Sequence, residues 1–223
     1  MEIYILSIFP NMFESVFNET IIKRAQEKKL VKIETVNIRD FTHDKHRTTD
    51  DYPYGGGAGM VMKPEPIYEA MDYVKEKSPN IHTILLTPAG KIFNQNKAKE
   101  LSKKDSIAII CGRYEGFDER VRYLADEEIS LGRFVLSGGE IAAMAIVDAT
   151  VRLIPGVLGN EESLKEESFE DGLIEYPQYT RPRVYRGMAV PDILLSGNHK
   201  KIKEWRMQKA KERTLKWIGV EDG

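Results

Sequence analysis

Residues 109–140 read IICGRYEGFDERVRYLADEEISLGRFVLSGGE and hold five of the chain's 17 glycines. Two short apolar runs, residues 107–111 and 134–136, each lead into a glycine-bearing turn. Short apolar runs that stop at such turns are typical of buried strands. Glycine lets the backbone approach a ligand closely and adopt a positive φ. The stretch therefore predicts two loops that form one ligand pocket at the ends of adjacent parallel strands, although tight turns alone would also explain the glycines.

Outward from this stretch, apolar patterns predict strands at 2–8, 31–38, 81–86, 106–111 and, for the most part, 128–136. Helical spacing of apolar residues predicts helices at 11–28, 64–77, 94–102, 117–125 and 140–154. This alternation favours an α/β fold with a parallel sheet. Between them, residues 39–62 are polar and without apolar period, and a loop of that length in a compact domain is usually functional or disordered.

Composition describes an ordinary globular chain of 223 residues, with 41% hydrophobic residues, 30% charged residues and a net charge of −2. The charge is unevenly spread, because residues 161–175 hold seven acids and one lysine, whereas residues 198–217 hold eight Lys or Arg and two acids. This predicts an acidic segment followed by a basic C-terminal face. The first apolar run is too short to span a membrane and has no basic flank, so we expect a cytoplasmic protein.

Several other sites have little support. Cys111 ends an apolar run with no base nearby, so a small buried residue is favoured over a nucleophile. His43, Asp44 and His46 would suit a metal, but no further cluster accompanies them, and solvated loop residues are favoured. The glycines at 55–59 match neither the dinucleotide fingerprint nor the phosphate loop, and no metal site is predicted.

Specific motifs go further than these patterns. The chain contains RDFTHDKHRTTDDYPYGGGAGM (39–60), LLTPAGK (85–91), CGRYEGFDERV (111–121), GRFVLSGGE (132–140), RLIPGVLG (152–159), ESFEDGL (167–173), PQYTRP (177–182) and LLSGNHKKIKEWR (194–206). In these stretches and their order it closely resembles the bacterial tRNA (guanine-N1-)-methyltransferase family, which modifies the guanosine just 3′ of the anticodon, at position 37. The YGGGAGM and SGNH stretches point more narrowly to this family than GRYEG and LSGGE, which related methyltransferases share in looser form.

The resemblance implies an α/β fold of the SPOUT class, knotted as a trefoil, with a small C-terminal helical domain. It further implies a homodimer with its active site at the subunit interface, S-adenosylmethionine as cofactor and tRNA as partner, with no membrane role. The corresponding domains are a catalytic domain at 1–160, an acidic linker at 161–175 and a tRNA-binding domain at 176–223. A Mg²⁺ requirement stays open, since the sequence shows no cluster of ligands for it.

The resemblance also assigns the cofactor site to three loops. They comprise Leu86, Thr87 and Pro88; Gly112, Arg113, Tyr114, Glu115 and Gly116; and Leu131, Gly132, Arg133, Phe134, Val135, Leu136, Gly138 and Gly139. Arg133 departs from the family, which often has aspartate there, and a site that uses only the backbone would tolerate the change.

Methylation at guanine N1 needs a base for the N1 proton and a cation for the charge that develops on O6. The family's base is an aspartate before a Ser-Phe pair, and here Glu167 takes that place, one methylene longer. Composition alone would make these acids a solvated hinge, and Glu170 or Asp171 could compensate for the changed geometry. Arg152 matches the arginine that faces the target base, although an i,i+4 ion pair with Asp148 would also explain it.

RNA contacts are implied for the SGNH turn and the basic helix after it, namely Ser196, Asn198, His199, Lys200, Lys201 and Arg206. A solvated helix face is the alternative for the basic residues. Two other functions stay open at this point, a related knotted methyltransferase with another RNA target and an RNA-binding module with a vestigial cofactor pocket.

Overall fold

The computed structural model describes residues 1–159, 167–169 and 172–221, the last helix with side chains through residue 218. The chain divides into two compact units, Met1–Gly159 and Asn160–Gly223. We call them the N-terminal unit and the C-terminal unit, and each is described by itself.

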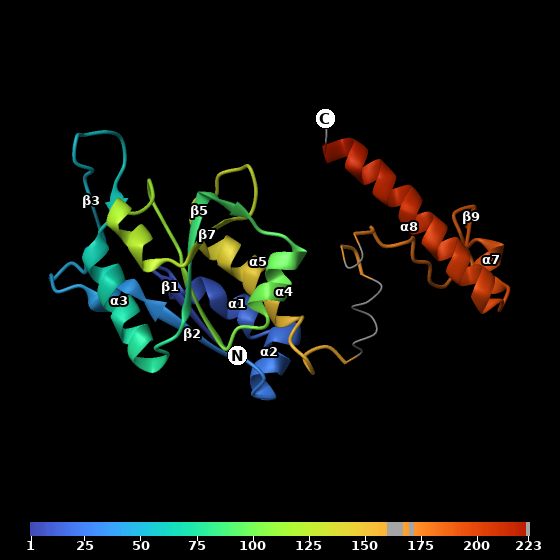
Figure 1. The fold of residues 1–223 in the computed structure, drawn as a ribbon, viewed down its shortest axis with the longest axis horizontal. Helices are drawn as coiled ribbons and strands as arrows, with labels where there is room; N and C mark the ends of the chain where they lie inside the picture. Colours follow the sequence, from blue (N-terminus) through green and yellow to red (C-terminus); the bar gives the residue numbers. More distant parts are fainter. Residues whose placement is uncertain (160–166, 170–171, 222–223) are drawn as a thin grey trace. The chain divides into compact units, whose positions relative to one another are not determined.

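A five-stranded sheet with every neighbouring pair parallel forms the middle of the N-terminal unit (Figure 1). Its strand order is β2-β1-β6-β5-β7. The strands are β1 (Glu2–Ser7), β2 (Lys32–Asn37), β5 (His82–Ile92), β6 (Ser106–Ile110) and β7 (Glu127–Ser130). The predicted α/β fold with a parallel sheet is confirmed.

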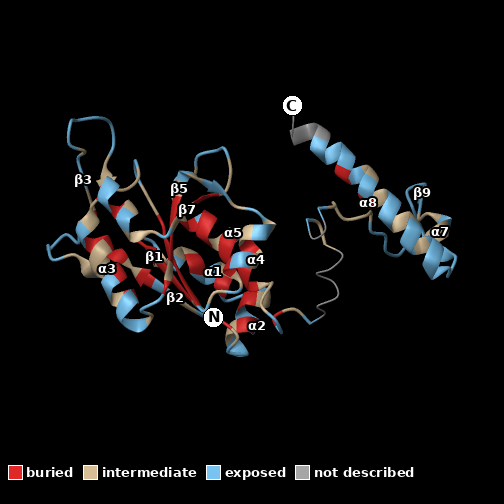
Figure 2. Ribbon diagram, viewed as in Figure 1, coloured by how far each residue is buried: buried red, intermediate tan, exposed pale blue. Residues whose placement is uncertain are grey.

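Successive side chains of a strand point to opposite faces, and both faces of this sheet are buried. Ile3 and Ile5 of β1 pack in a core with the short α1 (Glu14–Phe17), α2 (Thr20–Glu27), α4 (Gln95–Leu101) and α5 (Glu140–Val151). Tyr4 and Leu6 pack in a second core, with α3 (Pro64–Lys77), η2 (Ile38–Phe41) and η3 (Glu119–Leu124). The result is a three-layer fold whose buried residues follow the strands (Figure 2).

The predicted single helix at 11–28 is wrong in part. The segment forms η1 (Pro10–Phe13), α1 and α2, with a break at Asn18 and Glu19. Glu19 has extended backbone with ψ of 164°, and Thr20 has a φ of 52°, so helical hydrogen bonding cannot continue through them. Apolar spacing does not detect such a break, because apolar residues recur on both sides of it.

The predicted strand at 128–136 is also wrong beyond Ser130. The chain forms a loop there, and Phe134 and Val135 are 55% and 84% exposed. Their apolar run therefore does not mark a buried strand in this unit. The helix predicted at 117–125 is the shorter 3-10 turn η3, whose first turn is capped by the Asp118 carboxylate, which accepts from the backbone N of Arg120 at 3.0 Å.

Two loops carry more order than expected. Strand β5 continues past Leu86 to Ile92, with a register shift between Leu86 and Lys91 against β7. The long polar segment contains a small antiparallel ladder of β3 (Asp50–Asp51) and β4 (Val61–Met62).

The C-terminal unit is small and helical for most of its described length. It contains a two-stranded ladder of β8 (Val184–Tyr185) and β9 (Met188–Ala189), the short α7 (Asp192–Leu195) and the long α8 (His199–Glu221). Asn198 caps α8, because its side-chain oxygen accepts from the backbone N of Lys201 at 3.1 Å.

Candidate functional site

Three loops meet at the carboxyl ends of adjacent strands. The first is the irregular stretch of β5 between Leu86 and Lys91, where the register against β7 shifts, and the other two follow Ile110 of β6 and Ser130 of β7. Since these strands are parallel neighbours, the three segments lie at one edge of the sheet. A cavity of about 420 Å³ lies between the loops. Of the predicted cofactor residues, the following line it: Leu86, Thr87, Pro88, Gly112, Arg113, Tyr114, Glu115, Gly116, Leu131, Phe134, Val135, Leu136, Gly138 and Gly139.

Gly132 and Arg133 belong to the third loop but do not line the cavity. Sequence reasoning missed other lining residues: Phe117, Glu119, Arg122, Ile129, Ser130, Ser137 and Ala142. Ser130 immediately precedes the third loop and Ser137 lies inside it, so taking the loop as the continuous range 130–139 would have found both.

Close backbone contact between the second and third loops requires glycine. The backbone N of Gly139 donates to the Gly112 carbonyl at 2.9 Å. A Cβ added to Gly139 would lie 2.8 Å from the Cα of Cys111 and 3.0 Å from the backbone N of Gly112. Neither contact can be relieved by turning a side chain. These glycines therefore do more than allow tight turns, because they let two pocket loops touch through their backbones.

A buried ion pair holds the same two loops. The Nε of Arg113 donates to the Oε2 of Glu140 at 2.9 Å, and the Glu140 side chain is fully buried at the start of α5. The hydroxyl of Ser7, at the end of β1, donates to the other Glu140 oxygen at 2.7 Å. Arg113 also donates to the carbonyl of Ser137 at 3.2 Å and lies over the Phe9 ring. The guanidinium of Arg113 thus joins the second loop to the third.

The glycine-rich part of the long polar segment adjoins the second loop. The backbone N of Glu115 donates to the Met60 carbonyl at 3.0 Å, and the backbone N of Met62 donates to the Gly116 carbonyl at 2.9 Å. Gly59 lies against the Glu115 side chain, where a Cβ would approach to 2.5 Å. The motif singled out in the sequence is therefore packed beside the pocket, a position that no periodicity could reveal.

Cys111 is fully buried at the end of β6, and burial, with the nearby Glu140 carboxylate, raises the pKa of its thiol well above the usual value. This confirms a buried structural cysteine. His43 lies 2.8 Å from the Glu69 carboxylate, and Asp44 accepts from Thr48 and from the backbone of His46. Among the described residues, no group of three or more His, Cys, Asp and Glu could hold a metal ion.

Arg152 and the pocket lie at opposite ends of α5. Gly139 precedes the first turn of this helix, and Arg152 is its C-terminal cap, with its backbone N donating to the Asp148 carbonyl at 3.3 Å. A helix of this length spans about 18 Å. Arg152 does not line the cavity of its own unit.

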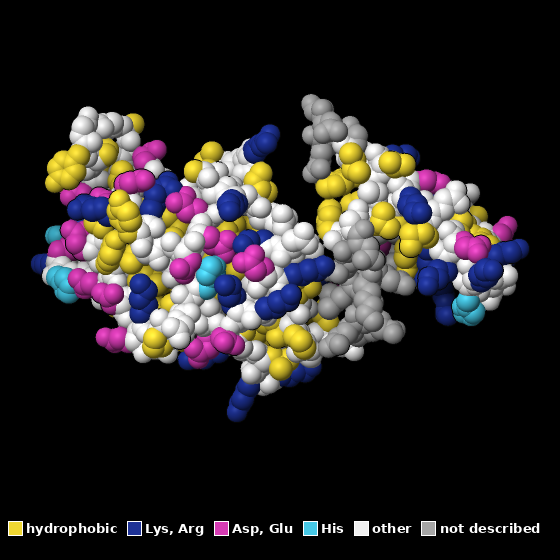
Figure 3. Space-filling view, viewed as in Figure 1, with side chains coloured by type: hydrophobic (Ala, Val, Ile, Leu, Met, Phe, Trp, Pro, Cys, Tyr) yellow, Lys and Arg dark blue, Asp and Glu magenta, His cyan; other side chains and the backbone are white. Residues whose placement is uncertain are grey.

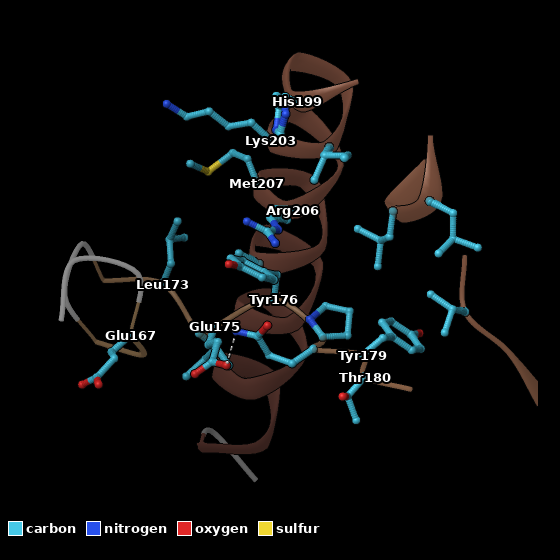
Figure 4. A pocket seen from close by; sticks show the side chains of 18 of the residues that line it. Glu167, Leu173, Glu175, Tyr176, Tyr179, Thr180, His199, Lys203, Arg206 and Met207 are labelled. Carbon is cyan, nitrogen blue, oxygen red and sulfur yellow. Dashed lines mark hydrogen bonds between the residues drawn. The ribbon is translucent and has the colours of Figure 1, made fainter. Parts of the chain in front are cut away.

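The C-terminal unit holds a second cavity, of about 810 Å³, along α8 (Figure 4). Glu167, His199 and Arg206 of the predicted site line it, together with Tyr176 and Lys203. The Arg206 guanidinium lies over the Tyr176 ring, 4.7 Å from its centroid. This is a cavity of mixed aromatic and cationic character, the combination that binds exposed bases and phosphates.

The remaining predicted RNA residues lie at the start of α8, outside that lining. Ser196 donates to the Ile193 carbonyl and accepts from the backbone N of Asn198, which in turn caps the helix. Lys200 and Lys201 are exposed on its first turn. Lys, Arg and His side chains gather at this end of the unit, with some acids among them (Figure 3). Glu170 and Asp171, the alternative bases, lie outside the described residues.

Known proteins resemble this chain over almost its whole length. The profile of the family "tRNA (Guanine-1)-methyltransferase TrmD" matches residues 1–217. The chain belongs to the TrmD family. The tRNA (guanine-N(1)-)-methyltransferase of Dictyoglomus turgidum is 59% identical over 96% of this chain and 87% of its own length, and that of Geobacter sp. is 60% identical over 96% and 87%. The crystal structure of tRNA (m1G37) methyltransferase from Aquifex aeolicus has a TM-score of 0.82 at 46% identity, and covers 97% of this chain and 92% of that one.

The resemblance to the TrmD family inferred from the motifs is thereby confirmed. No helix among the described residues is long and apolar enough to cross a membrane.

Proposed function

We propose that this protein transfers the methyl group of S-adenosylmethionine to N1 of guanosine 37 in tRNA. The observation that carries the proposal is the match to the TrmD family over residues 1–217, with its glycine loops gathered around one cavity. A related methyltransferase acting on another RNA is the second candidate, and the presence of both YGGGAGM and SGNH in this chain argues against it.

S-adenosylmethionine fits the cavity of the N-terminal unit. The volume of about 420 Å³ lies within the range of cofactor sites. Backbone groups of the three loops would hydrogen-bond the adenine, while Leu86, Leu131 and Leu136 would pack on it. When bound, the cofactor supplies an electrophilic methyl group on a sulfonium.

Glu167 and Arg152 are the residues that we assign to the chemistry. The guanine N1 keeps its proton at neutral pH, so the Glu167 carboxylate would accept that proton as general base, an effect worth about 10²–10⁴-fold in rate. The Arg152 guanidinium would stabilise the negative charge that develops on O6. Holding both reactants in line supplies much of the remaining acceleration.

A homodimer with its active site at the subunit interface explains two observations. Arg152 caps the far end of α5 and does not line the pocket of its own N-terminal unit, and in a homodimer the Arg152 of the second copy would reach this pocket. Phe134, Val135 and Ile141 are exposed apolar side chains in the third loop and at the start of α5. Exposed apolar groups of this kind mark interaction surfaces. We propose that they contact the second copy.

The remaining proposals follow from family membership. The N-terminal residues 1–160 form the catalytic domain of the SPOUT class, with a trefoil knot through its cofactor loops. Residues 161–175 are the linker that carries the base, and residues 176–223 form the domain that binds tRNA through the start of α8. The cytoplasm, where tRNA is processed, is the proposed location.

The test is methyl transfer from labelled S-adenosylmethionine to two tRNA transcripts that differ only at position 37. The transcript with guanosine at 37, preceded by guanosine, should be labelled at N1, and the transcript with adenosine at 37 should stay unlabelled. Equal labelling of both would move the target elsewhere in the RNA. Cofactor binding without label on either would favour the second candidate, a different RNA substrate.

A further inference from the structure

Two described stretches, residues 167–169 and 172–175, are joined by hydrogen bonds, and we call this contact the fold-back. Two residues after Glu167, Phe169 has a φ of 73°, a left-handed conformation that a residue with a Cβ rarely adopts. Its backbone N donates to the Leu173 carbonyl at 2.8 Å, and the hydroxyl of Ser168 accepts from the backbone N of Glu175 at 3.0 Å. A strained residue of this kind persists only where its surroundings hold it.

The C-terminal turns of α8 supply contacts that hold this segment. The Phe169 ring meets the Trp217 ring edge to face, with centroids 5.5 Å apart. The hydroxyl of Thr214, which is 8% exposed, accepts from the backbone N of Ile174 at 2.8 Å and donates to the Ala210 carbonyl at 2.8 Å. Arg213 donates to the carbonyl of Glu175 at 3.0 Å. Side chains on one stretch of helix, residues 213–217, therefore fix both sides of the fold-back.

The first turns of the same helix carry the exposed Lys200, Lys201 and Lys203, which we assign to tRNA phosphates. From Lys200 to Trp217 the helix is continuous. In a continuous α-helix, hydrogen bonds between successive turns fix the rise per residue, so the distance between two positions on the helix is constant. RNA held at the start of α8 is thus placed at a fixed spacing from the segment held near its end.

We propose that Thr214 and Trp217 are positioning residues for Glu167, and that α8 couples tRNA binding to the position of the Glu167 carboxylate. This inference rests on the proposed function, because it takes Glu167 as the general base. Neither residue touches the substrate. They act through the fold-back, which sets where the carboxylate stands relative to bound RNA.

The experiment measures single-turnover methyl transfer at saturating tRNA and cofactor for Thr214→Val and Trp217→Ala. Thr214→Val keeps the side-chain shape but leaves the backbone N of Ile174 without its acceptor. Trp217 is 39% exposed, so Trp217→Ala removes the ring contact without opening a core. Each should slow transfer by between about 10-fold and 10²-fold, the loss that small misplacements cause. Dissociation constants for S-adenosylmethionine and for tRNA should stay within about twofold of wild type on this view.

Conservative variants and a matched control separate positioning from folding. Thr214→Ser keeps the hydroxyl and Trp217→Phe keeps an aromatic ring, so both should recover most of the rate. Leu215→Ala changes an exposed side chain between the two positions and should leave the rate unchanged. Loss of tRNA affinity in Thr214→Val and Trp217→Ala, in parallel with the rate, would overturn the proposal, because α8 would then act only as an RNA-binding element.

Glu167→Gln separates this inference from the proposed function. If Glu167→Gln loses turnover while Thr214→Val and Trp217→Ala keep it, the positioning role is overturned and the base assignment stands. If Glu167→Gln keeps turnover, the base assignment falls and the positioning role falls with it, while labelling of guanosine 37 would still support the methyltransferase activity. Loss of turnover in all three variants, with binding intact, is the result that we expect.

Discussion

The pocket of the N-terminal unit and the Glu167 segment of the C-terminal unit are built by different means. The pocket loops leave a buried parallel sheet, touch through glycine backbones and are joined by the buried pair of Arg113 and Glu140. The Glu167 segment is held by side chains of one helix, and its aromatic contact joins two rings that are 44% and 39% exposed. The cavity is thus preformed by the core, whereas the position of Glu167 depends on contacts near the surface.

Because the two regions are held by different contacts, substitutions in them should have different effects. Alterations in the pocket should lower stability and cofactor binding together, because the same contacts serve both. Alterations in the acidic segment should lower turnover and leave stability nearly unchanged.

Glu167→Gln should show the largest effect on turnover. The amide keeps the size of the side chain but cannot accept the N1 proton, so the rate should fall by about 10²–10⁴-fold. Calorimetry should find the affinity for S-adenosylmethionine unchanged, since Glu167 is not in the pocket of the N-terminal unit. A rate equal to wild type would move the base to Glu170 or Asp171.

Arg113→Met should show the largest effect on stability. It leaves the fully buried Glu140 carboxylate without its charged partner, and breaking a buried pair in this way costs about 3–5 kcal/mol. Denaturant unfolding at fixed protein concentration measures the loss. Arg183→Met is the matched control, because its pair with Asp192 is largely exposed and should contribute at most about 1 kcal/mol.

The double variant Arg113→Met with Glu140→Leu tests the cause of that loss. Replacing both charged groups removes the unpaired carboxylate, so a large part of the stability should return. If the double variant is no more stable than Arg113→Met alone, lost packing around Phe9 and Ser137 explains the effect instead of the buried charge.

Gly139→Ala should have a smaller effect of the same kind. Its Cβ would lie 2.8 Å from the Cα of Cys111, so the third loop must move away from the second. We expect a loss of about 1–3 kcal/mol in the free energy of unfolding, typical of overpacking, together with weaker cofactor binding. Gly159→Ala is the control, because no atom lies within 4 Å of its added Cβ and its φ is not positive. If both variants lowered the free energy of unfolding equally, the close approach of the two loops would not contribute to stability.

Replacing Lys200, Lys201 and Lys203 by glutamine should have the smallest effect at low salt. Each lost phosphate contact lowers the slope of log affinity against log salt by about 0.7 to 0.9, so three contacts account for a change of about 2 to 3. Cofactor affinity should not change. As a control, Lys23, Lys75 and Lys103 are exposed in the N-terminal unit and give the same change in net charge. An unaltered slope in the α8 variant would mean that this helix does not grip phosphates.

Sequence patterns found most of the sheet and the place of the pocket. Apolar runs located β1, β2 and β6, and glycine-bearing turns located the loops that follow the strands. The family motifs then assigned roles to residues that patterns could not rank, and these roles stay predictions. Both signals come from residues that are neighbours in the sequence. They therefore locate a strand and the loop after it, but not contacts between distant segments.

The misses have a common physical reason. Ser7, Arg113 and Glu140 form one network although 133 residues separate the first from the last, and no periodicity links them. Phe134 and Val135 have the composition of a strand, yet both are exposed. Sequence alone does not distinguish an apolar residue at the surface from one in the core. The contacts of Phe169 with Trp217 depend on a left-handed backbone at a residue that is not glycine, which composition does not indicate.

Cys111 offers a consequence for experiment. It is the chain's single cysteine, fully buried beneath Gly139 where the pocket loops meet. Thiol reagents attack the thiolate, and burial raises the pKa of this thiol, so alkylation in the folded protein proceeds through transient opening of the surrounding structure. Its labelling rate therefore measures how often the structure at the base of the pocket opens. Slower labelling in the presence of cofactor would measure, without any mutation, how much ligand binding closes that region.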